Sequence, residues 1–349
     1  MSVTVKFLKA FHGDCIFITI SSESAEERIL IDGGPAATFS SGAQGELRNL
    51  LLELEEQNKT IDLVILTHID DDHIGGLIKA FEAEDGITKL AKKVLFNSGR
   101  LIHNYFNVKH APEKDIVGNF NQSQNTSVDQ GNTLEKLLGN KGVWHDSVIS
   151  QGDEYSLNHC KLHFLSPNEK ELEKLLGKWE SEQLSPFTSA SKTDWKLGYD
   201  ELLSQDEFSE DGSKTNGSSL SFILKVNEKN YLFLGDSHPS TVVEGLMNYG
   251  CQPGNPLQVE MCKVSHHGSK GNTNLELLSL IDCPKYIIST DGSRHGLPNK
   301  VTLARIHQMK PNAEILFNYA AVITDVYSTD EITQLDNKLI GLSGDIRFA

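Results

Sequence analysis

The stretch THIDDDHIGG, residues 67–76, brings two histidines and three aspartates close together. Neighbouring carboxylates repel one another unless a cation lies among them. Alternate residues of an extended loop point the same way, so His68 and Asp70 are expected to face one ion. Asp72 and His73 then turn to a second ion. Histidine nitrogen with carboxylate oxygen suits Zn²⁺ best, with Mn²⁺ as the alternative when the share of oxygen rises. The spacing therefore predicts a site for two divalent metal ions.

An acidic helix start is the simpler explanation, because aspartate is favoured in a first helical turn. It accounts for one or two aspartates but for neither flanking histidine. The preceding run IDLVILT (61–67) is almost continuously apolar, which predicts a strand buried on both faces. The following run GGLIKAFEAE (75–84) starts a helix, and its paired glycines allow a tight turn. The motif is therefore expected on a strand-to-helix loop.

The rest of the chain also alternates between strands and helices. Strands are predicted at 3–8, 15–20, 28–34, 92–97 and 160–167. Helices are predicted at 46–56 and 132–139, and another follows the strand at 160–167 and ends near residue 182. Two later strands are expected to form a hairpin that ends at 236. This mixture of hairpins and β-α units favours an α+β architecture in which two mixed sheets pack together with helices outside. We predict one domain over residues 1–349, with polar insertions near 98–150 and 183–214, the second of them a loop or lid.

The composition excludes several classes of protein. The formal net charge is −16, from 48 acidic and 32 basic residues, so broad non-specific binding to duplex DNA is not expected. No apolar run reaches the ~18 residues of a membrane helix, and the start lacks the features of a signal peptide. The five cysteines are scattered, and Cys15 and Cys262 lie in strand-like runs where buried free thiols are expected. These features predict a cytoplasmic protein.

The first motif resembles HxHxDH, the metal signature of the metallo-β-lactamase superfamily. Aspartate in place of the second histidine, followed by a glycine pair, is similar to the branch typified by the hydrolase domain of the DNA-uptake protein ComEC. Other segments resemble motifs of that branch in the expected order: GDCIFI (13–18), LIDGG (30–34), LFLGD (232–236), KVSHHGSKGN (263–272) and RHGLP (294–298). Five motifs in order make the resemblance specific, and they cover most of the chain.

The resemblance implies the metallo-β-lactamase fold, a four-layer αβ/βα sandwich with two metal ions in a cleft at one edge of the sheets. It also implies that Asp236 bridges the ions and that either His266 or His267 completes the second site. The full set of implied ligands is His68, Asp70, Asp72, His73, Asp236, and His266 or His267. Asp32 is expected behind them, where it would orient a ligand such as His68.

The chain departs from the family pattern in two places. Most of the superfamily has a further metal-binding histidine before the bridging aspartate, and none is evident here. Asn216 is expected near the first metal instead, as a weak ligand or as a substrate contact. Leu297 stands where the branch has histidine, so His295 is expected to be either the proton donor or a plain surface residue. Ser269 and Lys270 are expected either to contact an anionic substrate or to shape their loop.

The expected reaction is hydrolysis by a hydroxide that bridges two ions, with Asp72, Asp236 and His295 as catalytic residues. A phosphodiesterase or nuclease is favoured, because two ions neutralise both the attacking and the leaving oxygen. Its substrate would be a nucleotide or a short single strand. One alternative is a lactone, thioester or carboxylic ester hydrolase. Another is a partner-dependent effector or sensor module in a defence system, with a protein partner docked on the polar insertions.

Overall fold

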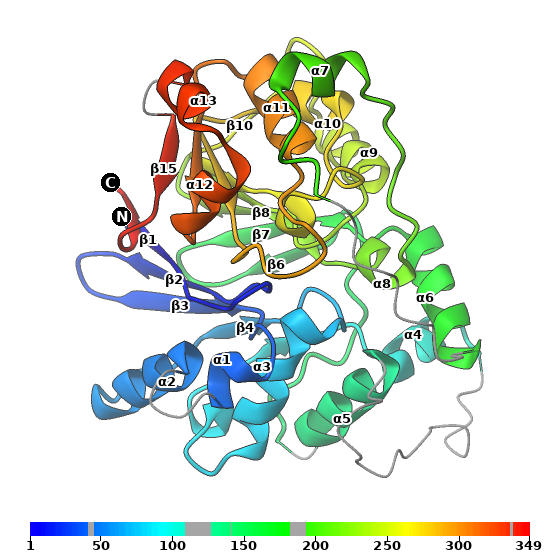
Figure 1. Cartoon of the computed structure of the whole chain (residues 1–349). Coiled ribbons are helices and arrows are strands. Elements are labelled where there is room, and N and C mark those ends of the chain that lie inside the picture. The colour runs from blue at the N-terminus through cyan, green and yellow to red at the C-terminus, as the bar shows by residue number, and fades with distance from the viewer. Residues whose placement is uncertain (41–44, 109–126, 140, 182–192, 336–337) are drawn as a thin grey trace.

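The computed structural model describes residues 1–40, 45–108, 127–139, 141–181, 193–335 and 338–349. Two β-sheets pack face to face, and helices cover the outer face of each (Figure 1). The layers therefore run helix, sheet, sheet, helix. This arrangement confirms the predicted sandwich of mixed α and β layers.

The first sheet contains six strands. Their spatial order is β16 (Ile346–Phe348), β1 (Ser2–Phe7), β2 (Ile16–Ser21), β3 (Glu26–Ile31), β4 (Leu63–Ile65) and β5 (Val94–Leu95). β1, β2 and β3 form an antiparallel meander, while β3, β4 and β5 are parallel. The outer face is covered by α1 (Ala37–Ser40), α2 (Glu46–Glu56), α3 (Asp71–Glu82) and α5 (Ser127–Gly139). The four leucines of α2 are buried, as their helical spacing predicts.

The second sheet contains eight strands. Their spatial order is β15 (Leu339–Gly341), β14 (Glu314–Phe317), β13 (Lys285–Ile288), β11 (Met261–Lys263), β9 (Lys229–Phe233), β8 (Ser221–Val226), β7 (Lys161–Ser166) and β6 (Glu154–Ser156). The predicted hairpin is β8 with β9. From β9 to β15 the strands are parallel. The covering helices are α9 (Pro239–Tyr249), α10 (Leu275–Ser279), α11 (Lys300–Met309), α12 (Ala321–Val326) and α13 (Thr329–Gln334). β10 (Leu257–Gln258) and β12 (Ile281–Asp282) form a separate short pair.

An apolar layer fills the space between the sheets, with contributions from both, such as Ile18 and Phe222. The carboxyl ends of neighbouring parallel strands meet at one edge of a sheet. The segments that follow β3 and β4 are therefore neighbours, as are those that follow β9 and β11. These four segments contain most of the residues that the sequence predicts to bind metal.

The polar insertions contain more structure than the sequence predicts. In the first, α4 (Gly99–Tyr105) was not predicted, and α5 confirms the helix predicted at 132–139 but begins earlier, at Ser127. Trp179 of α6 (Glu169–Ser181) packs where a Cβ on Gly99 or Gly131 would lie. Residues 109–126 lie outside the described part of the chain.

Over its described residues, 193–214, the second insertion contains helices and fixed contacts and is not the loop or lid that the sequence predicts. Residues 193–211, called the anchored segment below, contain α7 (Tyr199–Ser204) and are tied to the second sheet's helices. The Asp194 carboxylate accepts hydrogen bonds from two backbone amides at the start of α11, and the Trp195 indole donates to the Pro298 carbonyl at 2.8 Å. The short helix α8 (Lys214–Gly217) follows. Residues 183–192 of this prediction lie outside the described ranges.

The cysteines and the helices of the structure bear on two expectations drawn from the composition. All five cysteines are buried and unpaired, which confirms the prediction for Cys15 and Cys262. Among the described residues, no helix combines the length and apolar character needed to cross a membrane.

Candidate metal centre

Four imidazole rings converge on the carboxylate of Asp236, which follows strand β9. The Nε2 atom of His73 lies 3.4 Å from Asp236 Oδ2. The Nε2 atoms of His68, His266 and His267 each lie 3.8 Å from the same oxygen. The first two histidines come from the segment after β4, and the last two from the turn after β11. The two sheets thus deliver two histidines each to one aspartate.

The Nδ1 atoms of His73 and His267 face oxygens that can only accept a hydrogen bond. His73 Nδ1 donates to the Asp32 carboxylate at 2.8 Å, and His267 Nδ1 donates to the Ser289 carbonyl at 2.7 Å. An acceptor at Nδ1 keeps a proton there, so in the neutral ring Nε2 carries a lone pair. Both Nε2 atoms are buried, and neither forms a hydrogen bond to any described residue.

His68 and His266 are held in the same way. The Thr67 hydroxyl donates to the Asp32 carboxylate at 2.8 Å, so its oxygen is left to accept from His68 Nδ1 at 3.1 Å. His266 Nδ1 donates to the Asn272 side-chain carbonyl at 2.9 Å. All four rings therefore direct an Nε2 atom to one place and use Nδ1 to maintain that direction. This is the arrangement that metal-binding histidines adopt.

Two carboxylates lie where the cluster opens to solvent. The side chains of Asp70 and Asp72 are 27% and 23% exposed. Asp70 Oδ2 lies 3.7 Å from His68 Nε2, and Asp72 Oδ2 lies 3.4 Å from His267 Nε2. The Thr215 hydroxyl donates to Asp70 Oδ2 at 2.9 Å. The cluster thus has two halves, each with a partly exposed carboxylate that an incoming molecule can approach.

The helix after the motif starts earlier than predicted. α3 begins at Asp71, so Asp72 and His73 lie in its first turn and not on a loop. The physical reason is that aspartates in a first turn face the positive end of the helix dipole. Asp71 itself is exposed, and its carboxylate accepts from Gln130 of α5 at 2.5 Å. It therefore faces away from the histidines, as expected for the one aspartate of the motif outside the predicted ligand set.

Asp32 contacts a different histidine from the one named in the sequence analysis. Its carboxylate accepts from His73 Nδ1, while its link to His68 runs through Thr67. The reason is that the first turn of α3 carries His73 back over the end of β3, where Asp32 lies with φ 58°. The Thr67 amide also donates to Asp32, at 2.7 Å. One buried carboxylate therefore orients two histidines.

A buried ion pair beside the cluster was not predicted from the sequence. Asp14 and Lys263 are both fully buried, and their side chains form an ion pair. Ligand atoms of Asp14, His73, Asp236 and His267 all lie within 4.8 Å of one another, so Asp14 also has the position of a ligand. Because its charge is already paired with the Lys263 ammonium, we assign Asp14 a structural role. The available signal was the aspartate of GDCIFI and the lysine that opens KVSHHGSKGN.

The charges of the cluster favour a cation. Burial raises the pKa of Asp236, but the imidazoles of His73, His267 and His266 outweigh it and hold that pKa well below the ordinary value. Burial lowers the pKa of His68, and neighbouring His73 lowers it further. Burial lowers the pKa of His73 and of His266, but nearby carboxylates, Asp236 foremost, outweigh it and raise the pKa of His266 to about 9. Without an ion the cluster thus favours protonated rings around an ionised Asp236, and a divalent cation would take the place of those protons. The residues present therefore fit the metal ions that the motif predicts.

The model of the metallo-beta-lactamase superfamily matches residues 8–292 of the chain, which is most of its length. The chain belongs to the metallo-beta-lactamase superfamily. Members of this superfamily are hydrolases, so the fold implies a hydrolase that uses divalent metal ions.

Individual relatives are distant. The chain is 28% identical over 156 residues to a hydroxyacylglutathione hydrolase of Psychromonas ingrahamii, a match that spans 44% of this chain and 51% of that protein. The chain thus matches about half the length of that curated relative. The solved metallo-beta-lactamase fold protein YhfI of Bacillus subtilis is 9% identical, with a TM-score of 0.38 and 99% of each chain covered. Zn²⁺-bound PqqB of Methylobacterium extorquens is 10% identical, with a TM-score of 0.40 and 100% of each chain covered.

The substrate residues predicted for this superfamily member have other contacts. Asn216 lies close to the histidines, and its amide donates to Asp211 at 2.7 Å. The Ser269 hydroxyl accepts from the Gly271 amide, so it shapes its loop. Lys270 lines a cavity of about 290 Å³ beside the anchored segment. Their roles toward a substrate stay predictions.

Two further histidines, His295 and His12, lie outside the predicted ligand set. His295 is exposed, and its backbone has φ 57°. Within the described residues, no hydrogen bond or ion pair joins it to the predicted ligands, so its role as proton donor stays a prediction. His12 was not assigned from the sequence. Burial lowers the pKa of His12, while the nearby Asp72 carboxylate raises it. His12 therefore lies within electrostatic reach of the exposed side of the cluster.

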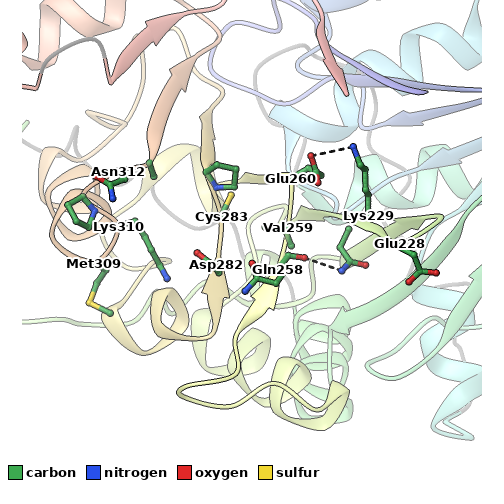
Figure 2. A pocket seen from close by; sticks show the side chains of 14 residues that line it. Glu228, Lys229, Gln258, Val259, Glu260, Asp282, Cys283, Met309, Lys310 and Asn312 are labelled. Carbon is green, nitrogen blue, oxygen red and sulfur yellow. Dashed lines mark hydrogen bonds and ion pairs between the residues drawn. The ribbon is translucent and has the colours of Figure 1, made fainter. Parts of the chain in front are cut away.

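The superfamily fold also forms a cavity away from the histidines. It has a volume of about 650 Å³ and is lined by residues that precede strands β9, β11, β13 and β14, such as Glu228, Gln258 and Asp282 (Figure 2). Asp236 follows β9, and His266 and His267 follow β11. This cavity therefore lies at the opposite ends of these strands. It contains no histidine, and its cysteine, Cys283, has a pKa that burial raises to about 12. In the part of the chain that the structure describes, the acidic groups of this cavity do not converge as those around Asp236 do.

Proposed function

We propose that this protein is a hydrolase with two metal ions that share Asp236. The first ion would be held by His68, Asp70 and His266, and the second by Asp72, His73 and His267. One observation carries the proposal, namely that four Nε2 atoms lie within 3.4 to 3.8 Å of Asp236 Oδ2. Each of the four Nδ1 atoms has a hydrogen-bond partner.

In this assignment His266 and His267 each bind a different ion. His267 Nε2 lies beside Asp72, which supports the second site for this ring. His266 lies beside Asn216, and the adjacent Thr215 donates to Asp70 of the first site. His266 would therefore replace the histidine that the sequence lacks before the bridging aspartate. The first site would then have two histidines and Asp70 besides the shared Asp236.

The ions, when bound, would lower the pKa of a water molecule toward about 7 and neutralise the charge that develops on the attacked group. The chain would contribute the positions of the groups. Asp236 stays ionised because positive charge lies beside it, on the protonated rings of His73, His267 and His266 before ions bind and on the ions once they are bound. Asp72 and Asp70 border the open side, so a substrate would approach between them. His12 or His295 would supply the proton to the leaving group from the same side.

A phosphodiester is the substrate class that we favour. Two metal ions can neutralise the attacking and the leaving oxygen together, which suits in-line displacement at phosphorus. Within the superfamily we place the chain in the ComEC-like branch, because Asp70 replaces histidine and the HHGS motif is present. The net charge of −16 favours nucleotides or short single strands over duplex DNA. A cytoplasmic location also fits the five unpaired cysteines.

A thioester hydrolase is the second candidate. It is supported by the partial match to the hydroxyacylglutathione hydrolase of Psychromonas ingrahamii. The two candidates differ in the atom attacked, which is phosphorus in one case and a carbonyl carbon in the other. A single dinuclear site can serve either reaction.

The test is a combined measurement of metal content and activity. The protein loaded with Zn²⁺ or with Mn²⁺ is assayed on bis-nitrophenyl phosphate, single-stranded DNA, RNA, a lactone and a thioester. We expect about two ions per chain and turnover of a phosphodiester that a chelator abolishes. Two bound ions with turnover of the thioester alone would replace the leading candidate by the second. Failure to bind metal would refute both. Activity that appears only with a protein partner would support the partner-dependent module instead.

A further inference from the structure

His266 occupies a strained turn that other residues must hold in place. Its backbone angles are φ 45° and ψ 53°, in the left-handed region that non-glycine residues rarely adopt. The neighbouring His267 has φ 53°. Backbone bonds hold the turn, since the His266 amide donates to the Gly235 carbonyl at 3.0 Å. They do not determine which nitrogen of the ring carries the proton.

Three side chains surround the Nδ1 atom of His266. Asn272 Oδ1 lies 2.9 Å away, Asn216 Nδ2 lies 3.3 Å away and Asp211 Oδ2 lies 3.4 Å away. The two amides compete for the ring, because one presents an acceptor to Nδ1 and the other a donor. A neutral ring that donates to the Asn272 oxygen carries its proton on Nδ1, and its Nε2 is free to bind an ion. A neutral ring that accepts from the Asn216 amide carries its proton on Nε2 instead and has no lone pair there.

Asp211 decides this competition in favour of Asn272. Its Oδ2 accepts one N–H of Asn216 Nδ2 at 2.7 Å, a shorter contact than the 3.3 Å from that nitrogen to His266 Nδ1. Asp211 Oδ2 also lies 3.4 Å from His266 Nδ1, where it is a second acceptor for a proton on that nitrogen. The same oxygen accepts from Asn272 Nδ2 at 3.2 Å, so the amide of Asn272 is turned with its oxygen toward the ring. Asn272 Nδ2 also donates to the Asp236 carbonyl at 3.1 Å, which supports the same orientation. Asp211 thus acts on His266 both directly and through two asparagine side chains.

The position of Asp211 is built into the fold. The backbone amide of Asp211 donates to the Gly271 carbonyl at 3.1 Å. Five residues earlier, Asp206 accepts two hydrogen bonds from the buried guanidinium of Arg305, at 2.7 and 2.5 Å. That guanidinium also donates to the carbonyls of Lys270 and Thr273, in the loop after the paired histidines. Arg305 therefore ties the anchored segment to the loop after His267.

We propose that Asp211 is a positioning residue that makes His266 a ligand of the first metal ion. Occupancy of the first site would then depend on the anchored segment, which lies outside every metal motif of the sequence. The second site would be independent of Asp211, since His267 is oriented by the Ser289 carbonyl. This inference rests on the proposed function, because it takes His266 as a metal ligand.

The test compares Zn²⁺ binding by the whole chain and by three variants. In Asp211→Asn the affinity for one ion should fall about 10- to 100-fold, as for other residues that orient metal ligands, while the second ion binds as before. Asp211→Glu should recover most of the loss, because it restores a carboxylate. Glu210→Gln is the matched control: Glu210 is the adjacent acidic residue, but its carboxylate accepts from Ser240 and not from the asparagines. Its binding should be unchanged.

A spectroscopic readout separates positioning from general damage. In the zinc-loaded protein, the ¹⁵N shifts of the His266 ring should show a ligated Nε2 and a protonated Nδ1. In Asp211→Asn they should show an unligated ring, with circular dichroism unchanged. Equal affinity for both ions in wild type and Asp211→Asn, or a ring that stays ligated, would overturn the inference while leaving the dinuclear hydrolase intact. A wild-type chain that binds fewer than two ions would instead refute the proposed function, and the inference with it.

Discussion

At the scale of single residues, Asp236 is the side chain on which the other groups depend. It is the common neighbour of four imidazole nitrogens, and it lies at the end of β9, where the sheet holds its backbone with or without metal. Asp236→Ala should therefore fold normally but lose both ions. Activity should fall at least 1,000-fold, on the order of 4 kcal/mol of transition-state stabilisation.

Asp71→Ala is the control for that experiment. Asp71 lies in the same acidic motif, but its carboxylate contacts Gln130 on the surface and not the histidines. Metal analysis and phosphodiester kinetics should show this variant close to wild type. If Asp71→Ala were inactive and Asp236→Ala active, the ligand assignment would be wrong.

His307 on α11 provides a test of pH dependence away from the metal centre. Burial, and to a lesser degree Lys338, lowers the pKa of His307 to about 4. In the unfolded chain this pKa is about 6.5, so between pH 6.5 and 4 the unfolded state binds more protons. Folding stability should therefore decrease as the pH falls through this range. The contribution is on the order of 3 kcal/mol at its upper limit.

His307→Phe isolates this effect. The phenyl ring keeps the edge-to-face contact with Tyr199, whose ring centre lies 5.7 Å away. Urea unfolding at pH 7.5 and pH 5 should show a smaller acid-induced loss in the variant than in wild type. Any loss of folding stability at low pH that is caused by metal release should be the same in both proteins. Equal losses would mean that His307 is not neutral in the folded protein.

At the scale of elements, close contact between α3 and the end of β3 places the motif. A Cβ on Gly76 would lie 2.0 Å from the Gly33 carbonyl oxygen, and one on Gly33 would lie 2.4 Å from the Leu77 amide. Only glycine permits this approach, which holds His73 over Asp32. Gly76→Ala should therefore destabilise the protein by about 3 kcal/mol and weaken metal binding.

Gly177→Ala is the matched control on a helix that has room. Gly177 lies inside α6, where an added Cβ would meet no other described residue within 4 Å. Alanine is the better helix former by about 1 kcal/mol, so this variant should be stabilised. Thermal unfolding of both variants measures the contrast. Similar effects of the two substitutions would show that the approach of α3 to β3 is not tight.

At the scale of the whole molecule, one buried ion pair joins the two sheets. Asp14 precedes β2 of the first sheet, and Lys263 ends β11 of the second. Their side chains are 2% and 1% exposed. Removing either partner leaves an unpaired buried charge, so Asp14→Asn and Lys263→Met should each cost about 3–5 kcal/mol.

The double variant Asp14→Asn/Lys263→Met completes the cycle. If the two charges stabilise each other, its loss of stability should be well below the sum of the single losses. Urea unfolding of the four proteins gives this coupling energy. Strict additivity would mean that the two residues act independently, and that the sheets are joined mainly by the apolar layer between them.

The sequence by itself determined the features that depend on local pattern. Helix α2 follows from four leucines at helical spacing, and the hairpin of β8 and β9 from two apolar runs around a short turn. The ligands of the first motif follow from residue type and spacing. These features can be predicted from the sequence because each one depends on neighbours within a few positions along the chain.

Only the tertiary structure decided which distant groups meet. It placed His266 beside Asn216 and His267 beside Asp72, a division that adjacent residues in a sequence cannot reveal. The left-handed turn presents both rings to Asp236, and the order of the strands determines which other groups each ring contacts. Asp211 lies in a polar segment without a motif, because its position depends on the remote anchor of that segment at Arg305 and not on its immediate neighbours.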